Sequence, residues 1–263
     1  LELRDVENLF CAGQINGTSG YEEAAGQGLM AGINASLWLE GKEPLILKRD
    51  EAYIGVMIDD LVTKGTEEPY RLLTSRAEYR LLLRHDNADM RLRDYGYNVG
   101  LISDARYQKY QDKMELIASL KQQLKEVRFT PKHDVNAYLQ EVGYEPLKDG
   151  LSIYELLKRP KLELLRLIEG TDIQMDEEMA RQIEIEVKYE GYIDKARKEA
   201  DRLAAMERLL LPKDINYDEV PHLALEARQK LKEIRPETIG QASRISGVNP
   251  ADISVLMVYL KLR

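Results

Sequence analysis

The sequence predicts a mainly α-helical protein, in which a helical C-terminal domain follows the last strand, loop and helix of an α/β domain. Three observations support this fold class. A short apolar run at residues 9–12 leads into a glycine-rich stretch, as at the end of a buried strand. Small residues then fill the next helix, which suits tight packing on a sheet. From Ser103 onward, apolar residues recur at the three- and four-residue spacing of amphipathic helices.

The composition limits the class of protein. Of the 263 residues, 44% are hydrophobic and 32% are charged, with a net charge of −8; this excludes a protein that coats nucleic acid over its whole surface. The single cysteine excludes an internal disulfide and suits the reducing cytoplasm, where we expect the protein. No apolar run approaches the ~20 residues of a membrane span, and no secretory signal is present. Three scattered histidines and one cysteine give no metal-ligand spacing.

The N-terminal end reads as the middle of a domain. It has no initiator methionine, and no Gly-x-Gly-x-x-Gly follows a strand anywhere in the sequence. We therefore expect the C-terminal part of a longer protein, without the segment that would hold a dinucleotide's pyrophosphate. The expected organisation is a domain remnant at residues 1–60, an arginine-rich helical region with a long helix at 61–145, and an all-helical domain at 146–263.

The most informative stretch is a glycine-rich loop that leads into a helix. Its glycines, Gly13, Gly17 and Gly20, tolerate positive φ and let a ligand approach the backbone closely. The helix is predicted from Tyr21 to Leu39, and two glutamates in its first turn favour its N-terminus. The loop and the helix start together offer a site for anions and carbonyl oxygens. An ordinary strand-to-helix turn explains the spacing equally well.

A second informative stretch, residues 70–93, holds six arginines in an acidic chain. A helix that starts at Thr74 or Ser75 would place three of them, four residues apart, on one face. Guanidinium groups bind phosphate through paired hydrogen bonds, and Tyr70 and Tyr79 could stack on unpaired bases. The alternative is a solvated face that pairs with nearby acids. The candidate phosphate-binding residues are Arg71, Arg76, Arg80 and Arg84.

The remaining elements follow from caps and apolar periodicity. Before the arginines, residues 45–60 are predicted to be irregular, with Asp59 capping a short helix. A loop at 143–150 is expected to separate two helical subdomains. Gly191 lies inside a long predicted helix at a cost of about 1 kcal/mol relative to alanine, so we expect another helix or a partner close to its backbone. The predicted helices span 60–64, 103–127, 130–139, 152–157, 162–168, 176–210, 223–234, 239–246 and 251–262.

The last two predicted helices have the outline of a DNA-binding helix-turn-helix, but two features argue against that function. Ser243 stands where the motif needs alanine. The would-be recognition helix is apolar and carries Asp252 where phosphate contacts are needed. Such a helix is core or a protein-docking face.

Four separated stretches together resemble one known family. Residues 12–35 read Ala-Gly-Gln-x-Asn-Gly, Gly-Tyr-x-Glu, Gln-Gly and Ala-Gly-x-Asn-Ala at the family's spacing. The sequences at 74–84, 189–193 and 239–248 match further family motifs. The chain is similar to the C-terminal portion of the GidA/MnmG family, the large FAD-binding subunit of the tRNA uridine 5-carboxymethylaminomethyl modification enzyme.

This resemblance implies a function for the intact enzyme. Such an enzyme holds FAD, is reduced by NADH, and works as a homodimer with a GTPase partner of the MnmE type and a methylene-folate. It adds an aminomethyl or carboxymethylaminomethyl group to C5 of the wobble uridine of tRNA. Residues 1–60 would be the end of its Rossmann-like FAD-binding domain. We expect this segment alone to be inactive and without FAD and NADH, and no catalytic acid or base is assigned.

The resemblance also assigns roles to residues. The FAD-binding residues would be Gln14, with Gly13, Asn16, Thr18, Gly20 and Tyr21. The tRNA-binding residues would be Arg71 and Arg80 first, then Arg76 and Arg84. The GTPase-docking residues would be Tyr189, Gly191, Tyr192, Ile239 and Arg244.

Two other functions stay open at this point. A folate-dependent tRNA uridine methyltransferase shares a similar Gly-Gln…Gly-Tyr loop, although its relatives lack the long helical tail. A helical GTPase-docking module without activity describes the segment in isolation.

Overall fold

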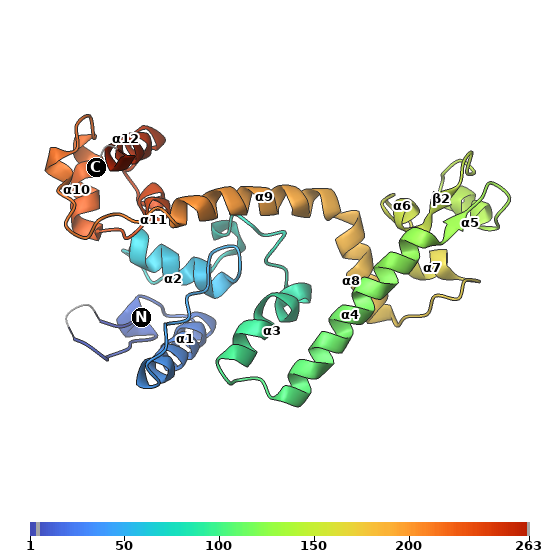
Figure 1. Cartoon of the computed structure of the whole chain (residues 1–263), viewed down its shortest axis with the longest axis horizontal. Helices are drawn as coiled ribbons and strands as arrows, with labels where there is room; N and C mark the ends of the chain where they lie inside the picture. Colours follow the sequence, from blue (N-terminus) through green and yellow to red (C-terminus); the bar gives the residue numbers. More distant parts are fainter. Residues whose placement is uncertain (4–5, 262–263) are drawn as a thin grey trace. The chain divides into compact units, whose positions relative to one another are not determined.

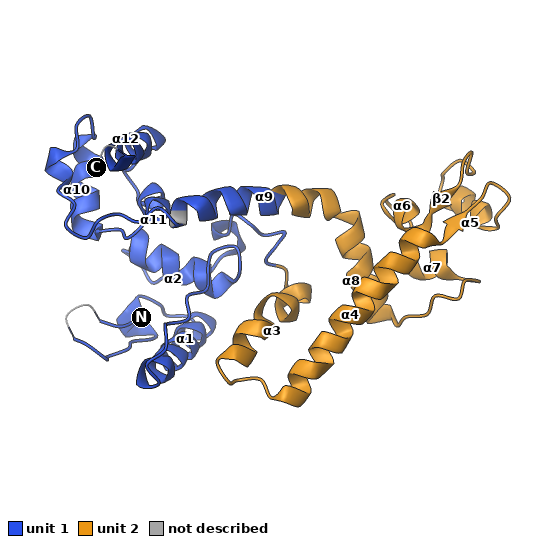
Figure 2. Cartoon of the chain, in the orientation of Figure 1, with its two compact units in different colours: residues 1–83, 196–263 blue, residues 84–195 orange. Residues whose placement is uncertain are grey.

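The computed structural model describes residues 1–3 and 6–261, and most of that chain is helical (Figure 1). The predicted mainly α-helical fold is therefore confirmed. The chain forms two compact units, one of residues 1–83 with 196–263 and one of residues 84–195 (Figure 2). The boundaries expected after residues 60 and 145 fall inside these units.

The first unit joins both ends of the sequence. Its C-terminal part has a core that includes Tyr217, Leu231 and Leu256, all almost completely buried. The Thr238 side chain caps α11 by accepting a hydrogen bond from the Gln241 N–H, as predicted. Its helices are α1 Tyr21–Leu39, α2 Tyr53–Thr63, α10 Leu225–Ile234, α11 Ile239–Arg244 and α12 Pro250–Lys261, with the 3-10 turns η1 Gln14–Asn16, η2 Thr74–Arg76 and η4 Tyr217–Glu219. The predicted end of the last helix, at 262, lies outside the described residues.

The second unit packs short helices on one face of the long helix α4, Asp104–Glu126. Ile117, Leu120 and Leu124 form that buried face. Ser152 and Glu155 cap α6 reciprocally. The other elements are η3 His85–Asn87, α3 Ala88–Asn98, α5 Val135–Glu141, α6 Ile153–Leu157, α7 Leu164–Ile168 and α8 Glu177–Lys188, with β1 Arg128–Phe129 pairing antiparallel to β2 Leu151–Ser152. Elements on both sides of the loop at 143–150 share one core, so that loop does not separate two subdomains.

The strand predicted at residues 9–12 is present only as a short antiparallel pairing. Phe10 forms an isolated bridge with Glu2, flanked by bonds from the Leu3 N–H to the Leu9 carbonyl and from the Cys11 N–H to the Leu1 carbonyl. The expectation that it is buried is wrong, because Leu9 is 46% exposed.

The short helix expected at residues 60–64 is also wrong, because α2 already begins at Tyr53. Asp59 and Asp60 lie in the last turns of α2, where both carboxylates accept hydrogen bonds from Arg49. Asp59 therefore does not cap the helix. The apolar residues that looked irregular in sequence form the buried face of α2, which includes Val56 and Met57.

No helix follows Thr74, so Arg76, Arg80 and Arg84 do not share a helix face. The single 3-10 turn η2 ends at Arg76, and Ala77 returns to extended backbone. The Arg76 carbonyl accepts a hydrogen bond from the Arg49 side chain, which takes an acceptor that a helix would use.

The long helix predicted at residues 176–210 is interrupted. Tyr189 leaves helical geometry and separates α8 from α9, which spans Glu190–Glu207 and continues from the second unit into the first. A Cβ added at Gly191 would have no neighbour within 4 Å. The expected close approach of another helix at Gly191 is therefore wrong.

Because Gly191 is helical and faces open space, we predict that Gly191→Ala stabilises the chain. The free energy of unfolding should rise by about 0.5 kcal/mol, since alanine loses less backbone entropy on folding. Urea denaturation measures it. Gly170→Ala is the matched control: Gly170 also has open space but a φ of +75°, so this variant should be less stable. A destabilised Gly191→Ala would contradict the prediction.

A glycine loop and an arginine segment on one support

The loop before α1 turns at two glycines that have positive φ angles. Gly13 has a φ of +83° and Gly17 a φ of +79°, and η1 lies between them. The predicted need for positive φ is met at these two positions. Gly20 differs, because its backbone is extended. Gly20 is needed because a larger residue does not fit: a Cβ there would collide with the carboxylate of Glu23.

One buried side chain fixes this loop. Gln27 of α1 is fully buried, and its Oε1 accepts hydrogen bonds from the Gly13 N–H at 2.7 Å and the Thr18 hydroxyl at 3.2 Å. Its Nε2 donates to the Asn16 carbonyl at 3.1 Å. Gln27 was not predicted from the sequence, where its signal is an amide side chain between Gly26 and Gly28.

A hollow of about 340 Å³ opens beside the loop. Gln14 is exposed on its wall, and Tyr21 is 93% exposed at the start of α1. The N-cap residue of α1 is Gly20, which has no side chain to cap the helix, so the amides that precede Glu23 can bind a ligand. The hollow is lined by Gln14, Gly17, Thr18, Ser19, Thr66, Glu67, Glu68 and Pro69.

The predicted FAD-binding residues therefore have two different positions. Gln14 and Tyr21 present their side chains to solvent beside the loop. Thr18 is buried, and its hydroxyl is committed to Gln27. The Asn16 amide donates to the Cys11 carbonyl at 3.4 Å. Thr18 and Asn16 can thus shape the loop but do not offer free side chains to a ligand.

The arginine segment lies directly against the glycine loop. The Tyr70 N–H donates to the Gly17 carbonyl at 2.8 Å, and Thr18 and Tyr70 form a parallel bridge. Glu23 of α1 adds a side-chain link. Its Oε1 accepts from the Leu72 N–H at 2.8 Å and lies 3.3 Å from Nε of Arg71. The glycine loop and the arginine segment, which are far apart in the sequence, are thus both bound to side chains of α1.

The surroundings of the Glu23 carboxylate favour its ionised form. The Leu72 N–H bond lowers the pKa of Glu23, burial raises it, and Arg71 lowers it further, so the pKa lies below its ordinary value. Only 4% of Glu23 is exposed.

Three of the four candidate arginines are exposed. Arg71 and Arg80 are exposed, and the Arg80 side chain forms no hydrogen bond or ion pair with other described residues. Arg76 lies 4.5 Å from the centre of the Tyr70 ring and donates to the Arg71 carbonyl at 2.9 Å. Arg84 belongs to the other unit and pairs with Asp86, with 15% of its side chain exposed.

The predicted stacking of Tyr70 and Tyr79 on bases is wrong. Tyr70 is 3% exposed and Tyr79 6%, so neither ring has a free face for a base. The Tyr70 hydroxyl instead donates to Asp60 at 2.8 Å. Burial and this bond raise the pKa of Tyr70 far above its ordinary value.

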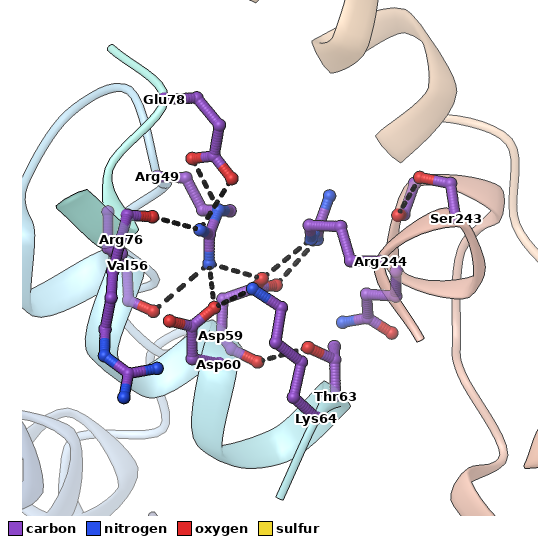
Figure 3. Close-up of polar contacts among 12 residues, drawn as sticks. Arg49, Val56, Asp59, Asp60, Thr63, Lys64, Arg76, Glu78, Ser243 and Arg244 are labelled. Carbon is purple, nitrogen blue, oxygen red and sulfur yellow. Dashed lines mark hydrogen bonds and ion pairs between the residues drawn. The ribbon is translucent and has the colours of Figure 1, made fainter. Parts of the chain in front are cut away.

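Beneath the arginine segment, the almost fully buried Arg49 joins three carboxylates (Figure 3). It binds Glu78 through two hydrogen bonds, of 2.8 and 3.1 Å. It also donates to Asp59 at 3.0 Å and to Asp60 at 2.7 Å. Burial opposes ionisation of Asp60, but bonds from Lys64 and Arg49 lower its pKa below the ordinary value. No local pattern predicts this cluster, because Arg49, the aspartates of α2 and Glu78 belong to three separate segments.

The same cluster anchors the C-terminal helices of the unit. Arg244 of α11 forms two hydrogen bonds to Asp59, of 2.6 and 2.7 Å (Figure 3). Arg244 was predicted to dock a partner; in the structure it is half-buried and pairs with Asp59 of the same chain. Ile239, from the same predicted set, is fully buried in the C-terminal core. Tyr189 and Tyr192, in contrast, are 45% and 69% exposed.

The described residues hold no group of three or more His, Cys, Asp or Glu side chains that could bind a metal ion. None of the helices described is long and apolar enough to cross a membrane.

Comparison with known proteins connects these features to one family. The model for the "tRNA modifying enzyme MnmG/GidA C-terminal helical bundle" matches residues 199–263, and that for the MnmG/GidA C-terminal helical domain matches 104–197. The model "Glucose inhibited division protein A" matches 1–43.

Individual relatives match along the whole chain. Proteins named tRNA uridine 5-carboxymethylaminomethyl modification enzyme MnmG are 54% identical in Acholeplasma laidlawii and 59% identical in Geobacillus kaustophilus, over 100% and 99% of this chain. The chain spans 43% and 42% of their lengths. The structure of Aquifex aeolicus GidA in its form II crystal matches with a TM-score of 0.83 and 44% identity, over 99% of this chain and 41% of that one.

We predict that Arg49→Met strongly destabilises the first unit. It leaves Asp59, Asp60 and Glu78 facing one another without their shared cation, and removing one partner of a buried ion pair costs about 3–5 kcal/mol. Urea denaturation at pH 7 measures the loss. Lys42→Met is the control, because Lys42 pairs with Glu40 in solvent and should change stability by less than about 0.5 kcal/mol. Similar stabilities for the two variants would contradict a structural role for Arg49.

Proposed function

The chain belongs to the MnmG/GidA family, and we propose that it supplies one wall of the FAD site and part of the tRNA surface of an enzyme that modifies the wobble uridine. The observation that carries this proposal is the open glycine loop beside three exposed arginines on one support. A flavin site next to a phosphate-binding surface is the arrangement that such a reaction requires.

The residues of the loop suit a flavin. Gln14 offers both an amide donor and an acceptor beside the hollow. The helix α1 has a glycine, Gly20, at its N-cap, and the amides near Ser19 to Tyr21 would face the carbonyl edge of the ring. There they would favour negative charge on the reduced ring. When bound, FAD supplies the redox chemistry, with NADH as the proposed reductant of the whole enzyme.

The exposed arginines suit the phosphates of tRNA. Arg71 and Arg80 come first, because both are exposed. Arg71 lies beside Glu23, where the arginine segment contacts the glycine loop, and Arg80 lies further along the same segment. Arg76 adds charge at the same place. Arg84 is a weaker candidate because Asp86 already neutralises it. The chain's role at this surface is to hold the anticodon region near the flavin, while the group transferred would come from a methylene-folate.

The helical parts suit protein partners. We propose that the GTPase of the MnmE type docks on exposed apolar and aromatic side chains of this chain, with Tyr189 and Tyr192 as candidates in the second unit. Nothing packs on Gly191 within the described chain, which leaves that backbone free for a partner. The intact enzyme is proposed to be a cytoplasmic homodimer.

The alternatives fit less well. A folate-dependent tRNA uridine methyltransferase would explain the loop but not the two helical matches at 104–197 and 199–263. A docking module without activity remains a fair description of the segment by itself. Flavin absorbance of the purified full-length protein separates the enzyme from the module.

We predict that Gln14→Ala in the full-length enzyme weakens FAD retention. The variant loses hydrogen bonds that together contribute about 1–2 kcal/mol, so the dissociation constant should rise roughly five- to thirtyfold. Flavin content after gel filtration measures the effect. Ile15→Ala is a suitable control, because Ile15 is 81% exposed and does not line the hollow. Unchanged flavin content in Gln14→Ala would count against this residue.

We also predict that Arg71→Ala in the full-length enzyme weakens tRNA binding. Loss of one phosphate contact should reduce the dependence of log K on log salt by about 0.7–0.9. Filter binding at several salt concentrations measures both affinity and slope. Lys42→Ala, which removes a cation elsewhere, should change neither. The assignment fails if Arg71→Ala leaves affinity and slope as they are in the wild type.

A further inference from the structure

Two side chains of α1 support two different candidate sites. Gln27 holds the glycine loop through three hydrogen bonds. Glu23 lies four residues earlier, hence on the same face of the helix, and holds the arginine segment at Arg71 and Leu72. The loop and the segment also bond directly, from the Tyr70 N–H to the Gly17 carbonyl. Neither site can move far without displacing the support of the other.

Glu23 is the least satisfied part of this support. Its Oε1 accepts both contacts from the arginine segment, whereas its buried Oε2 has no hydrogen-bond partner within the described chain. Oε2 lies against Gly20, at the junction of the loop and α1. A buried acceptor without a partner costs about 1–3 kcal/mol. A small movement that gave Oε2 a donor would therefore be favourable.

We propose that FAD binding at the glycine loop and RNA phosphate binding at Arg71 are energetically coupled through Glu23, so that each ligand raises the affinity for the other. This inference rests on the proposed function. The physical reason is that fixing loop backbone costs conformational entropy, about 1–2 kcal/mol per residue. The first ligand restricts the exposed residues of the loop, such as Gln14 and Ser19, which the shared support joins to the arginine segment. The second ligand then binds without meeting that cost again.

The test uses the full-length protein, FAD and an unmodified tRNA transcript. The dissociation constant of FAD is measured from its fluorescence with and without saturating tRNA, and that of tRNA by filter binding with and without saturating FAD. Coupling predicts that tRNA tightens FAD binding about fivefold or more. Linkage requires that FAD tighten tRNA binding by the same factor.

A matched pair of variants assigns the coupling to Glu23. Glu23→Gln keeps the shape of the side chain but loses the charge that pairs with Arg71, so the coupling factor should fall toward one. Glu22→Gln is the control, because Glu22 is the exposed neighbour in the same helix turn, and it should keep the wild-type factor. If Glu23 had only a structural role, Glu23→Gln would change the affinities for FAD and tRNA but leave the coupling factor at its wild-type value.

The outcomes separate this inference from the proposed function. If the wild-type protein binds neither FAD nor tRNA, the proposed function fails and the coupling with it. If it binds both, each with an affinity that ignores the other, the coupling is wrong and the proposed function stands. A coupling factor preserved in Glu23→Gln would overturn the role of Glu23. The wild-type measurement decides the coupling even if that variant does not fold.

Discussion

The candidate site depends on the burial of Gln27. An amide side chain with no exposure to water must find partners for its oxygen and nitrogen inside the protein. Gln27 finds them in the loop that precedes its own helix: the Gly13 N–H, the Asn16 carbonyl and the Thr18 hydroxyl. These bonds hold Gly13 directly, and they hold Gly17 through its neighbours Asn16 and Thr18. They therefore determine where the hollow beside Gln14 opens.

A second set of buried polar contacts positions the arginine segment. Arg49 binds Glu78, which follows the turn η2, and it also binds Asp59 and Asp60 of α2. Asp59 in turn binds Arg244 of α11. Residues from both ends of the sequence thereby become one unit, although their cores are separate clusters. Arg49 also binds the Arg76 carbonyl. These contacts hold the backbone of the arginine segment, while the side chains of its exposed arginines stay in solvent.

Local signals predicted much of the fold. The helix that begins at Tyr21, the long helix after Ser103 and the capped helices after Ser152 and Thr238 all lie where caps and periodicity place them. Each of these signals acts within a few residues along the chain. The family itself was also predictable, because its motifs are continuous in sequence.

Contacts between distant segments defeated the remaining predictions. Arg49 occupies the Arg76 carbonyl, so the arginines that looked helical form turns. Tyr70 is buried, and its hydroxyl donates to Asp60. No local pattern in the sequence indicates this contact. Gln14 lies exposed beside the hollow, whereas the contacts of Gln27 and Glu23 were not predicted. Their function appears only when the loop and the arginine segment are seen on the same helix.

The central claim is that α1 makes one structural unit of the glycine loop and the arginine segment. Hydrogen exchange of the full-length protein, with and without FAD, tests it most directly. The account predicts that FAD slows exchange of the amides at 13–21 and, together with them, those of Tyr70 and Leu72, which donate to Gly17 and Glu23. Slower exchange confined to 13–21, with Tyr70 and Leu72 unchanged, would contradict it.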